Sequence, residues 1–552
     1  MTTRTDFGVL YGQKTTASED TLLIYSSYED SKASPKIGDF IVLTPKDEGG
    51  RKFLARVEAE IYDEDPMFRN QDKTLVAVHY ARIAERELSE RDKQKMFSYT
   101  YRVKLLGTFE DKGTSISFTT AVRKLPVVSY HARYLSKNEV DSILNYVNTG
   151  GVSIGTLCIG EELHPDKAQI FFDLKRLQSR RTMVFAQSGF GKTNLVKVLV
   201  YQSLSNGSCG KLIFDLNGEY FAKSVSGTVG LGDIDEVKVR DNLIVYTDRS
   251  DVKEKYSGRF EYGGPVRLDT HKHLTVGDIL AFGAGFSEVM KSFLLYLDEN
   301  AVTGFISNID GYVANPSRLH IDFSDFFGEQ KVDKKTGLPV EDVSARKTIL
   351  AIRKRIRHLI DEGSVHKSGS AMLESTLTAL KSGKTVVIDL SLKDNMDASI
   401  ISTIIVRELF ERNKQNYTGN HIDEVIPAVI FVEEAQNVLS EEFVRSNANP
   451  FVRVAKEGRK FGLGIVAITQ RPSAISDEIR TQAENFFAFH MGNSDDIKAL
   501  VKSNIQYDGV ISAFLQRETI PGNLYYVTSG QSFVIPVRVV EFEQLVKDKL
   551  HR

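Results

Sequence analysis

One short segment, residues 186–193, constrains the fold of this chain more than any other part of its sequence. It reads Ala-Gln-Ser-Gly-Phe-Gly-Lys-Thr and follows an apolar run at residues 182–186. After it, apolar residues recur at helical spacing at Leu195, Val198 and Leu199, and a second apolar run occupies residues 211–216. A strand, a glycine-bearing loop, a helix and another strand form a βαβ unit, which requires a parallel sheet. The segment therefore predicts an α/β fold.

The residues of this loop are suited to holding phosphate groups. Gly189 and Gly191 let the backbone fold around an anion, with its N–H groups directed inward at the start of the helix. Lys192 would reach the β- and γ-phosphates of ATP, and Thr193 would hold Mg²⁺ through its hydroxyl. The expected nucleotide contacts are Ser188, Gly189, Phe190, Gly191, Lys192, Thr193 and Asn194. The alternative is a glycine-rich turn that binds no ligand.

Two adjacent carboxylates end another apolar run. Residues 428–432 predict a buried strand, and Glu433 and Glu434 follow it directly. Ligands of α/β sheets bind at the carboxyl ends of the strands, so both acids should lie beside the phosphate-binding loop. Glu433 would then contribute to the metal site, and Glu434 would orient or deprotonate the attacking water. Without the loop, the same residues would indicate only a strand that ends in two solvated acids.

Asp215 and Gln470 also follow apolar runs. A glutamine beside the γ-phosphate can hydrogen-bond both phosphate and water and relay the change on hydrolysis, so Gln470 is interpreted as a sensor. Asp215 is interpreted as part of the metal shell or as a residue that positions water. For both, the alternative is an ordinary polar loop residue.

Arg459 lies in the segment Glu-Gly-Arg-Lys-Phe-Gly, residues 457–462, which precedes the strand that ends at Gln470. A guanidinium at this position can serve as an arginine finger that neutralises transition-state charge in the site of a neighbouring subunit. This interpretation requires a ring, because each site would be completed in trans. The alternative is a surface salt bridge.

The charge balance limits the kinds of partner that the chain can bind. Its 552 residues include 71 Lys and Arg and 73 Asp and Glu, for a formal net charge of −2. This balance excludes a nucleic-acid binder that depends on bulk positive charge, although not one that concentrates positive charge on a local surface. The two cysteines, Cys158 and Cys209, form neither a disulfide framework nor a zinc site. Without a signal-peptide pattern or a membrane-spanning run, we expect a cytoplasmic chain with no membrane partner.

The length suggests about three structural units, at roughly 100–200 residues per domain. Short apolar or alternating segments separated by turn signals predict a small β-barrel or sandwich over residues 1–160. Residues 161–274 would form the first part of the nucleotide-binding core, and residues 382–552 its second part with a C-terminal strand region. Residues 275–381 show helical periodicity and predict a helical insertion between them.

Five motifs together resemble the HerA type of ATPase, in the HerA/FtsK branch of P-loop motors. They are residues 186–193, 215–220 (Asp-Leu-Asn-Gly-Glu-Tyr), 433–436 (Glu-Glu-Ala-Gln), 457–462 and 469–472 (Thr-Gln-Arg-Pro). The resemblance covers most of the chain and implies a RecA-like core preceded by a small β-barrel. Two residues depart from the family pattern, since Ala186 replaces a glycine and Gln436 stands where the family often has histidine. Neither change removes a catalytic group.

The resemblance also implies how the chain works. HerA-type proteins are homohexameric rings that use ATP and Mg²⁺ to move double-stranded DNA through a central pore. Lys192, Glu434 and Gln470 would act in one subunit and Arg459 in the next, and Arg180 or Arg181 matches another basic residue that is presented to a neighbouring site. Such proteins work with a nuclease. Bacterial relatives resemble motor subunits of antiphage defence systems, paired with a nuclease or a sirtuin-type NAD-consuming effector.

A duplex in a pore would be held mainly through its phosphates, by lysine and arginine side chains. Candidate contacts are Lys223, the segment with Arg445, Arg453 and Lys456, and the basic helix at residues 346–357, for which a solvated face is the favoured interpretation. Two functions remain open: an ATP-driven DNA translocase, and a ring scaffold that assembles and activates an effector with little DNA movement. A P-loop kinase or small-molecule transferase is disfavoured, because the Gln470 and Arg459 pattern suits a ring NTPase.

Overall fold

The computed structural model contains two compact units, neither of which is continuous in sequence. It describes residues 6–15, 20–27, 35–46, 50–64, 97–111, 116–159, 162–163, 167–205, 207–223, 227–282, 286–299, 304–320, 343–446 and 449–550. The barrel unit comprises Met1–Asp173 and Phe487–Val539, and the sheet unit comprises Leu174–Phe486 and Val540–Arg552. These limits differ from the boundaries expected from the sequence, because the chain returns to the barrel unit after residue 486 instead of completing the nucleotide-binding core.

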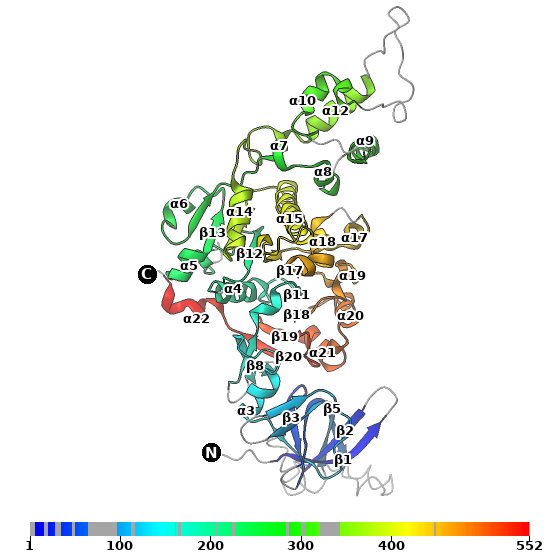
Figure 1. Ribbon diagram of the computed structural model, residues 1–552. Coiled ribbons are helices and arrows are strands. Elements are labelled where there is room, and N and C mark those ends of the chain that lie inside the picture. The colour runs from blue at the N-terminus through cyan, green and yellow to red at the C-terminus, as the bar shows by residue number, and fades with distance from the viewer. Residues whose placement is uncertain are drawn as a thin grey trace, which may run out of the picture. The chain divides into compact units, whose positions relative to one another are not determined.

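The N-terminal strands of the barrel unit close into a β-barrel, shown in blue in Figure 1. The order is β2-β1-β7-β3-β4-β5, and β5 pairs again with β2 to close the ring, while β6 pairs with the far end of β5. Buried apolar side chains such as Leu22, Ile41 and Val103 fill its core. The bounds are β1 Gly8–Thr15, β2 Asp20–Ser27, β3 Phe40–Thr44, β4 Lys52–Glu64, β5 Phe97–Asp111, β6 Ile116–Thr119 and β7 His131–Tyr134.

The rest of the barrel unit is a small antiparallel sheet with short helices. Strands β10, β8, β20 and β19 are paired in that order, so residues far apart in the sequence lie on neighbouring strands. A capping box between Ser136 and Glu139 begins α3. The bounds are α3 Lys137–Glu139, β8 Val152–Ile159, β9 Glu162–Leu163, β10 Gln169–Phe172, α20 Ser494–Ser503, α21 Val510–Arg517, β19 Asn523–Thr528 and β20 Ile535–Val539.

A parallel sheet forms the centre of the sheet unit, as the βαβ pattern predicts. Its strands follow the order β11-β17-β16-β12-β15-β13-β14, and every neighbouring pair is parallel. The inner strands β12, β15, β16 and β17 are buried along their whole length, as expected for apolar strands covered on both faces. The bounds are β11 Arg181–Phe185, β12 Gly210–Asp215, β13 Leu243–Tyr246, β14 Glu261–Gly264, β15 Thr385–Asp389, β16 Ala428–Val432 and β17 Leu463–Thr469; β18, Asn485–Ala488, crosses the limit between the units.

Helices cover this parallel sheet, and several of them lie between β14 and β15 in the sequence (Figure 1). Helix α14 contacts β12 and β15, α18 contacts β17, and the 24-residue helix α15 contacts α8 and α18. The bounds are α4 Lys192–Ser203, α5 Val237–Asn242, α6 Val252–Lys255, α7 Thr270–His273, α8 Val276–Phe282, α9 Glu288–Glu299, α10 Ile309–Ala314, α12 Val343–Arg355, α13 Arg357–Ile360, α14 Met372–Lys381, α15 Asn395–Thr418, α16 Gln436–Leu439, α17 Glu441–Ser446, α18 Pro450–Glu457, α19 Asp477–Arg480 and α22 Phe542–Val546.

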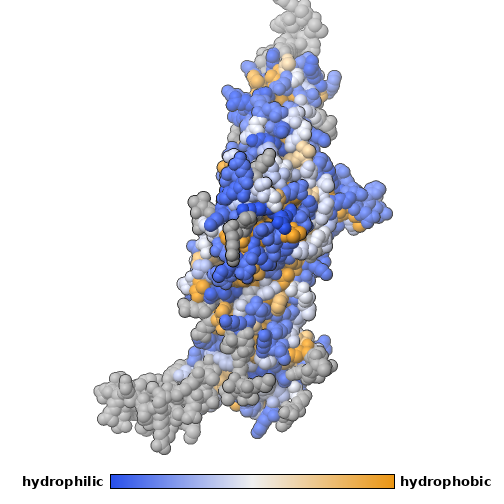
Figure 2. Space-filling model, turned by 90° about the vertical axis from the view of Figure 1, so that its left-hand side faces the viewer, coloured by the Kyte–Doolittle hydropathy of each residue, from blue (hydrophilic) through white to orange (hydrophobic). Residues whose placement is uncertain are grey.

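The surface is mostly hydrophilic on the face shown in Figure 2, where apolar residues appear as small, separate areas. Scattered apolar residues of this kind are normal on protein surfaces. Within the described residues, every helix is too short or too polar to cross a membrane.

Candidate nucleotide-binding site

The glycine-bearing loop joins the carboxyl end of β11 to the start of α4. Gly189 and Gly191 have φ angles of +84° and +107°, in the region that glycine adopts more readily than other residues. A Cβ added at Gly189 would meet no atom within 4 Å, so this position needs glycine for its backbone conformation and not for space. Helix α4 begins at Lys192 without a side-chain cap, which leaves its first N–H groups available to an anion. Ala186 does not have a positive φ, as its side chain requires.

Lys192, the first residue of α4, directs its side chain back to the start of this loop. Its Nζ atom donates a hydrogen bond to the Ala186 carbonyl at 3.2 Å. Burial lowers the pKa of Lys192, while the carboxylates of Glu434, Glu433 and Glu219 act in the opposite direction. The ammonium group therefore already lies in the field of three acids, in a loop shaped to bind phosphate.

The two acids that follow β16 differ in their surroundings. Glu433 accepts a hydrogen bond from the Tyr220 hydroxyl at 2.8 Å and one from the Asn217 amide at 3.5 Å. Burial, together with the nearby Asp215 and Glu219 carboxylates, raises the pKa of Glu433 to about 7. A carboxyl group with a raised pKa in an acid-rich cavity is one that a bound cation would stabilise in its ionised form.

Glu434 is held from both sides by amide groups. Its Oε2 accepts from the Gln436 side chain at 2.7 Å and its Oε1 from the Gln470 side chain at 3.2 Å. Gln436 in turn accepts a hydrogen bond from the Thr469 hydroxyl at 2.5 Å. Glu434 has a φ of +45°, a left-handed conformation that costs a non-glycine residue roughly 1–2 kcal/mol. The residue that departs from the family pattern, Gln436, thus contacts the acid assigned to water activation.

Asp215 organises a neighbouring loop. Its buried carboxylate accepts hydrogen bonds from the backbone N–H groups of residues 217, 218, 219 and 220, at 3.3, 2.8, 3.1 and 2.9 Å. Burial, partly offset by these bonds, raises the pKa of Asp215 to about 6. The loop carries Glu219, whose carboxylate accepts from the Thr193 hydroxyl at 3.4 Å, and Tyr220, which donates to Glu433. Asp215 therefore contacts the site through the loop that it holds.

A cavity of about 550 Å³ brings these residues together. Of the predicted residues, Ser188, Gly189, Gly191, Lys192, Thr193, Asn194, Glu433, Glu434 and Gln470 line it, whereas Phe190 and Asp215 do not. The sequence interpretation missed Asn217 and Glu219, although both lie in the quoted segment 215–220. It also missed Lys197, Thr228, Val229 and residues 541–543, which no sequence pattern marks.

The donor atoms around Thr193 suit magnesium. The Thr193 hydroxyl and the carboxylates of Glu219 and Glu433 are oxygen donors, which Mg²⁺ prefers. Among the described residues, no group of three or more His, Cys, Asp or Glu side chains could hold a metal ion. A hydrated Mg²⁺ held by one or two side chains and nucleotide phosphates fits this donor set.

The predicted arginines lie at the other edge of the same sheet. Arg459 precedes β17 and Arg181 begins β11, whereas the cavity residues follow these strands. Glu484 lies between the two arginines, with its carboxylate 3.9 Å from Arg459 Nη1 and 3.7 Å from Arg181 Nε. The Arg459 side chain is 73% exposed. A strand rises about 3.3 Å per residue, so the length of β17 places Arg459 roughly 20 Å from the cavity of its own chain.

Arg180 and Arg181 differ in the contacts that their side chains make within the chain. Arg181 donates to the Ala455 carbonyl at 3.0 Å and to the Gln482 side chain at 2.6 Å, in addition to its contact with Glu484. Arg180 is half-buried, and its guanidinium has no hydrogen bond or ion pair within the described part of the chain. Of the two, Arg180 is the one that is free to contact another molecule.

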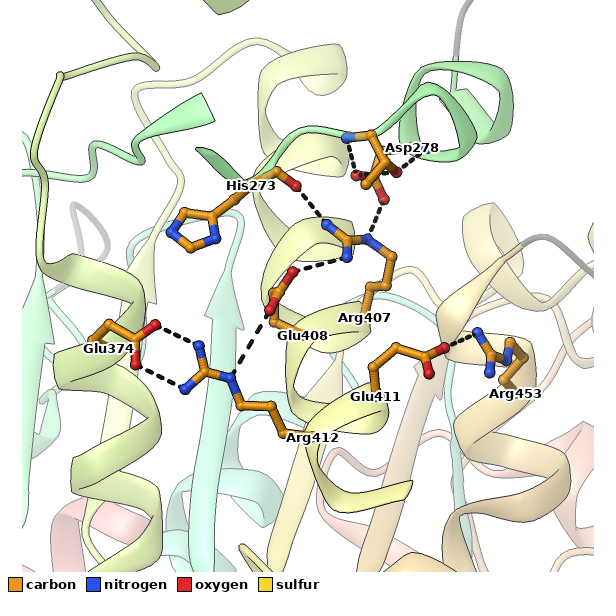
Figure 3. A network of polar contacts seen from close by, with 9 residues as sticks. His273, Asp278, Glu374, Arg407, Glu408, Glu411, Arg412 and Arg453 are labelled. Carbon is orange, nitrogen blue, oxygen red and sulfur yellow. Dashed lines mark hydrogen bonds and ion pairs between the residues drawn. The ribbon is translucent and has the colours of Figure 1, made fainter. Parts of the chain in front are cut away.

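Several of the basic residues considered for DNA contacts are paired with acids of their own chain. Figure 3 shows Arg453 directed at Glu411 of α15, at 2.5 Å, and its guanidinium also lies 4.4 Å from the centre of the Phe410 ring. The other paired residues are Arg353 with Asp310 and Asp361, Lys456 with Glu478, and Arg445 with Glu441. Lys223, Lys354 and Arg357 are exposed.

Comparisons with known proteins agree with this geometry. Residues 152–409 match the family model "Helicase HerA, central domain", and residues 347–497 match "Zonular occludens toxin (Zot)". The "DNA double-strand break repair helicase HerA" of Sulfurisphaera tokodaii is 24% identical over 379 residues, 69% of this chain and 66% of the relative. The protein of the same name from Pyrococcus furiosus is 23% identical over 455 residues, 75% of this chain and 74% of the relative.

Solved structures with similarity include VirB4 of Thermoanaerobacter pseudethanolicus, at 13% identity and a TM-score of 0.37, covering 71% of this chain and 98% of that one. The bacterial conjugative coupling protein TrwBdeltaN70 matches at 12% identity and a TM-score of 0.40, covering 70% and 94%. Scores this low do not define a shared overall structure, so the assignment depends on the sequence matches and on the site. Residues 152–409 are therefore similar to the central domain of HerA helicases, and the cavity carries the residues of a P-loop ATPase site.

Proposed function

We propose that this chain is an ATP-driven motor that acts as a homohexameric ring and translocates or unwinds double-stranded DNA. The observation that carries the proposal is the division of the site between the two edges of one sheet. The acids and the phosphate-binding loop lie at the carboxyl edge, and the exposed Arg459 lies at the amino edge. The relatives named as DNA repair helicases support DNA as the substrate.

In this proposal, the residues of one chain bind and orient the nucleotide. The N–H groups of the loop and Lys192 hold the phosphates, and Thr193 and Glu433 hold Mg²⁺, which neutralises phosphate charge when it is bound. Glu434 orients or deprotonates the attacking water. To do so it must release at least one of the amide groups of Gln436 and Gln470. This exchange would make Gln470 the sensor that responds to hydrolysis.

The neighbouring subunit supplies the cationic groups that the cavity lacks. The basic side chains lining the cavity in the described part of the chain are Lys192 and Lys197, with no arginine among them. Lys197 donates to the Val229 carbonyl and is buried, so Lys192 is the cation suited to the phosphates. Arg459 cannot reach its own cavity, and a cyclic assembly would bring the amino edge of one chain to the carboxyl edge of the next.

A second function is favoured by the paired basic residues. Because Arg353, Arg445, Arg453 and Lys456 contact acids of their own chain, these four are less available to DNA phosphates than the exposed Lys223, Lys354 and Arg357. The alternative is therefore an ATP-dependent ring scaffold that assembles and activates a nuclease or a sirtuin-type NAD-consuming effector, for instance in antiphage defence. Both functions use the same ATP site.

One experiment separates the two functions. The rate of ATP hydrolysis is measured with and without linear duplex DNA, together with displacement of a third strand from a triplex substrate. A motor hydrolyses ATP several times faster with duplex and displaces the third strand in an ATP-dependent way. Unchanged hydrolysis and no displacement would contradict the motor and favour the scaffold. Native mass spectrometry tests the ring, and a monomer with full ATPase activity would overturn it.

A further inference from the structure

A segment near the end of the sheet unit lines the nucleotide cavity. We call residues 540–550 the C-terminal strap; it follows β20 and contains α22. The side chain of Asn194, in the first turn of α4, clamps the strap through two hydrogen bonds. Its Nδ2 donates to the Val540 carbonyl at 3.0 Å, and its Oδ1 accepts from the Phe542 N–H at 2.8 Å. These bonds use both polar groups of the Asn194 side chain for the strap.

The strap is also anchored further along α4. The Phe542 ring is 2% exposed and packs edge-on against Tyr201, with 5.9 Å between ring centres. Lys549 donates to the Tyr201 hydroxyl at 2.9 Å and forms an ion pair with Glu236 at 2.8 Å. The strap is therefore fixed in place near both of its ends, at Phe542 and at Lys549.

One wall of the cavity consists of the strap and residues 228–229. Glu541, Phe542 and Glu543 line it together with Thr228 and Val229. Glu543 accepts a hydrogen bond from the Val229 N–H at 3.2 Å, and Lys197 donates to the Val229 carbonyl at 2.9 Å. Glu434 and Gln470, the residues assigned to hydrolysis, follow β16 and β17, are hydrogen-bonded to each other and do not belong to this wall.

The order of the chemical groups in a nucleotide indicates which part of it would contact this wall. The phosphates bind at the N-terminus of α4, beside Lys192 and Thr193. Asn194 follows them in the same turn and holds the strap, so the part of the ligand beyond the phosphates meets the strap. We propose that the C-terminal strap is the nucleoside-binding wall of the ATP site and that Glu541 accepts a hydrogen bond from the nucleoside. The inference rests on the proposed ATP site and adds what recognises the ligand there.

Glu541 is suited to this role. Its side chain is exposed, and its Oε2 accepts from Gln544 at 2.8 Å, which orients the carboxylate and leaves Oε1 for a ligand. An ionised carboxylate only accepts hydrogen bonds, so its partner must be a donor. A nucleoside offers such donors in its ribose hydroxyls and in the exocyclic amine of adenine.

The test compares two probes in the full chain, ADP and inorganic tripolyphosphate, both with Mg²⁺, by isothermal titration calorimetry. Glu541→Ala removes the acceptor, whereas glutamine would keep one in its carbonyl oxygen, so Glu541→Ala should weaken ADP binding about 10-fold and leave tripolyphosphate binding unchanged. The matched control Asp548→Ala removes the same charge at an exposed strap residue outside the cavity and should bind both probes like the parent chain. Equal ADP affinity in Glu541→Ala and the parent would overturn the proposal, as would equal weakening for both probes.

A second variant tests the clamp. Asn194→Ala keeps the backbone N–H of the loop but removes both bonds to the strap, so ADP should bind more weakly than in the parent while tripolyphosphate is unaffected. Hydrogen exchange at the Phe542 amide should accelerate. If that amide exchanges at the parent rate, Asn194 does not hold the strap. If the parent chain binds neither probe, the phosphate site itself is wrong, which is a different failure from loss of the strap effect.

Two analogues identify the donor. If Glu541 contacts the ribose, its substitution should make no difference to 2′,3′-dideoxy-ADP. If it contacts the adenine amine, substitution should make no difference to inosine diphosphate. An equal penalty with both analogues would show that Glu541 acts through its charge alone and would overturn its assignment as an acceptor.

Discussion

The two edges of the parallel sheet lie at opposite ends of the same strands and carry side chains of opposite charge. At the carboxyl edge, β16 and the loop after β12 gather Glu219, Glu433 and Glu434 around Lys192. At the amino edge, β11 and β17 begin beside Arg180, Arg181 and Arg459, with Glu484 between two of them. One edge has an excess of acids and the other an excess of arginines. The difference teaches that a single chain cannot bring its own two edges together, whereas in the proposed ring the arginine-rich edge of one chain would meet the acid-rich edge of the next.

Removing the cation of the carboxyl edge should have the largest effect. Lys192→Ala takes away the ammonium group beside the phosphates, and we expect ATP hydrolysis to be lost. Phosphate release is measured with saturating ATP and Mg²⁺, with Lys498→Ala, an exposed lysine of the barrel unit, as control. Retained turnover in Lys192→Ala would show that the carboxyl edge is not the ATP site.

Removing the exposed arginine of the amino edge should slow turnover without affecting binding. Arg459→Ala should lower kcat by about 10³-fold if the guanidinium acts as a finger, with an unchanged Kd for ATP. Mixing Arg459→Ala chains with Glu434→Ala chains should restore part of the activity, because some interfaces then combine an intact acid with an intact arginine. An inactive mixture, in rings shown by native mass spectrometry to contain both chains, would contradict the action of Arg459 in the site of a neighbouring chain.

Removing a hydrogen bond that supports the metal site should have a smaller effect on ATPase activity. Tyr220→Phe removes the hydroxyl that donates to Glu433 at 2.8 Å, and loss of such a supporting bond typically weakens metal binding 10–100-fold. The Mg²⁺ concentration that gives half-maximal ATPase activity should rise accordingly. Tyr507→Phe, which removes a buried hydroxyl bond to the Tyr525 carbonyl in the barrel unit, should leave that concentration unchanged. A similar Mg²⁺ requirement in both variants would refute a metal site at Glu433.

We expect the smallest effects from substituting the two adjacent arginines, Arg180 and Arg181, and we expect the two substitutions to affect different properties. Arg181→Ala breaks contacts with Ala455, Gln482 and Glu484 and should lower the free energy of unfolding by about 1–3 kcal/mol. Arg180→Ala should leave stability within about 0.5 kcal/mol but reduce ATPase activity. Thermal unfolding and phosphate release measure the two quantities. The reverse pattern would assign the intersubunit role to Arg181.

The parts of the site that were predictable from sequence depend on local patterns. The loop at residues 186–193 and the acids after β16 follow buried apolar runs, so their place at the carboxyl edge follows from strand direction. The inner strands β12 and β16 were predicted for the same reason, whereas β14, Glu261–Gly264, was not, because this edge strand is mostly exposed and contains two glycines.

Other features depend on contacts between distant residues. The strap lines the cavity because the chain returns from the barrel unit at residue 540, and no periodicity in the sequence marks that return. The position of Glu484 between Arg181 and Arg459 has the same origin. Asp215 was placed near the metal from its position after a strand, while its four backbone partners could be seen only in the folded loop.

Those four bonds have a consequence for the energetics of ligand binding. Because the Asp215 carboxylate fixes the backbone of residues 217–220, Glu219 and Tyr220 are held in position by the protein alone. A ligand that enters a site of this kind does not have to order the loop, so most of the conformational entropy has already been lost on folding. The heat-capacity change of nucleotide binding should then reflect little more than the surface that the ligand itself covers. Calorimetry at several temperatures would distinguish such a rigid site from one that folds around its ligand.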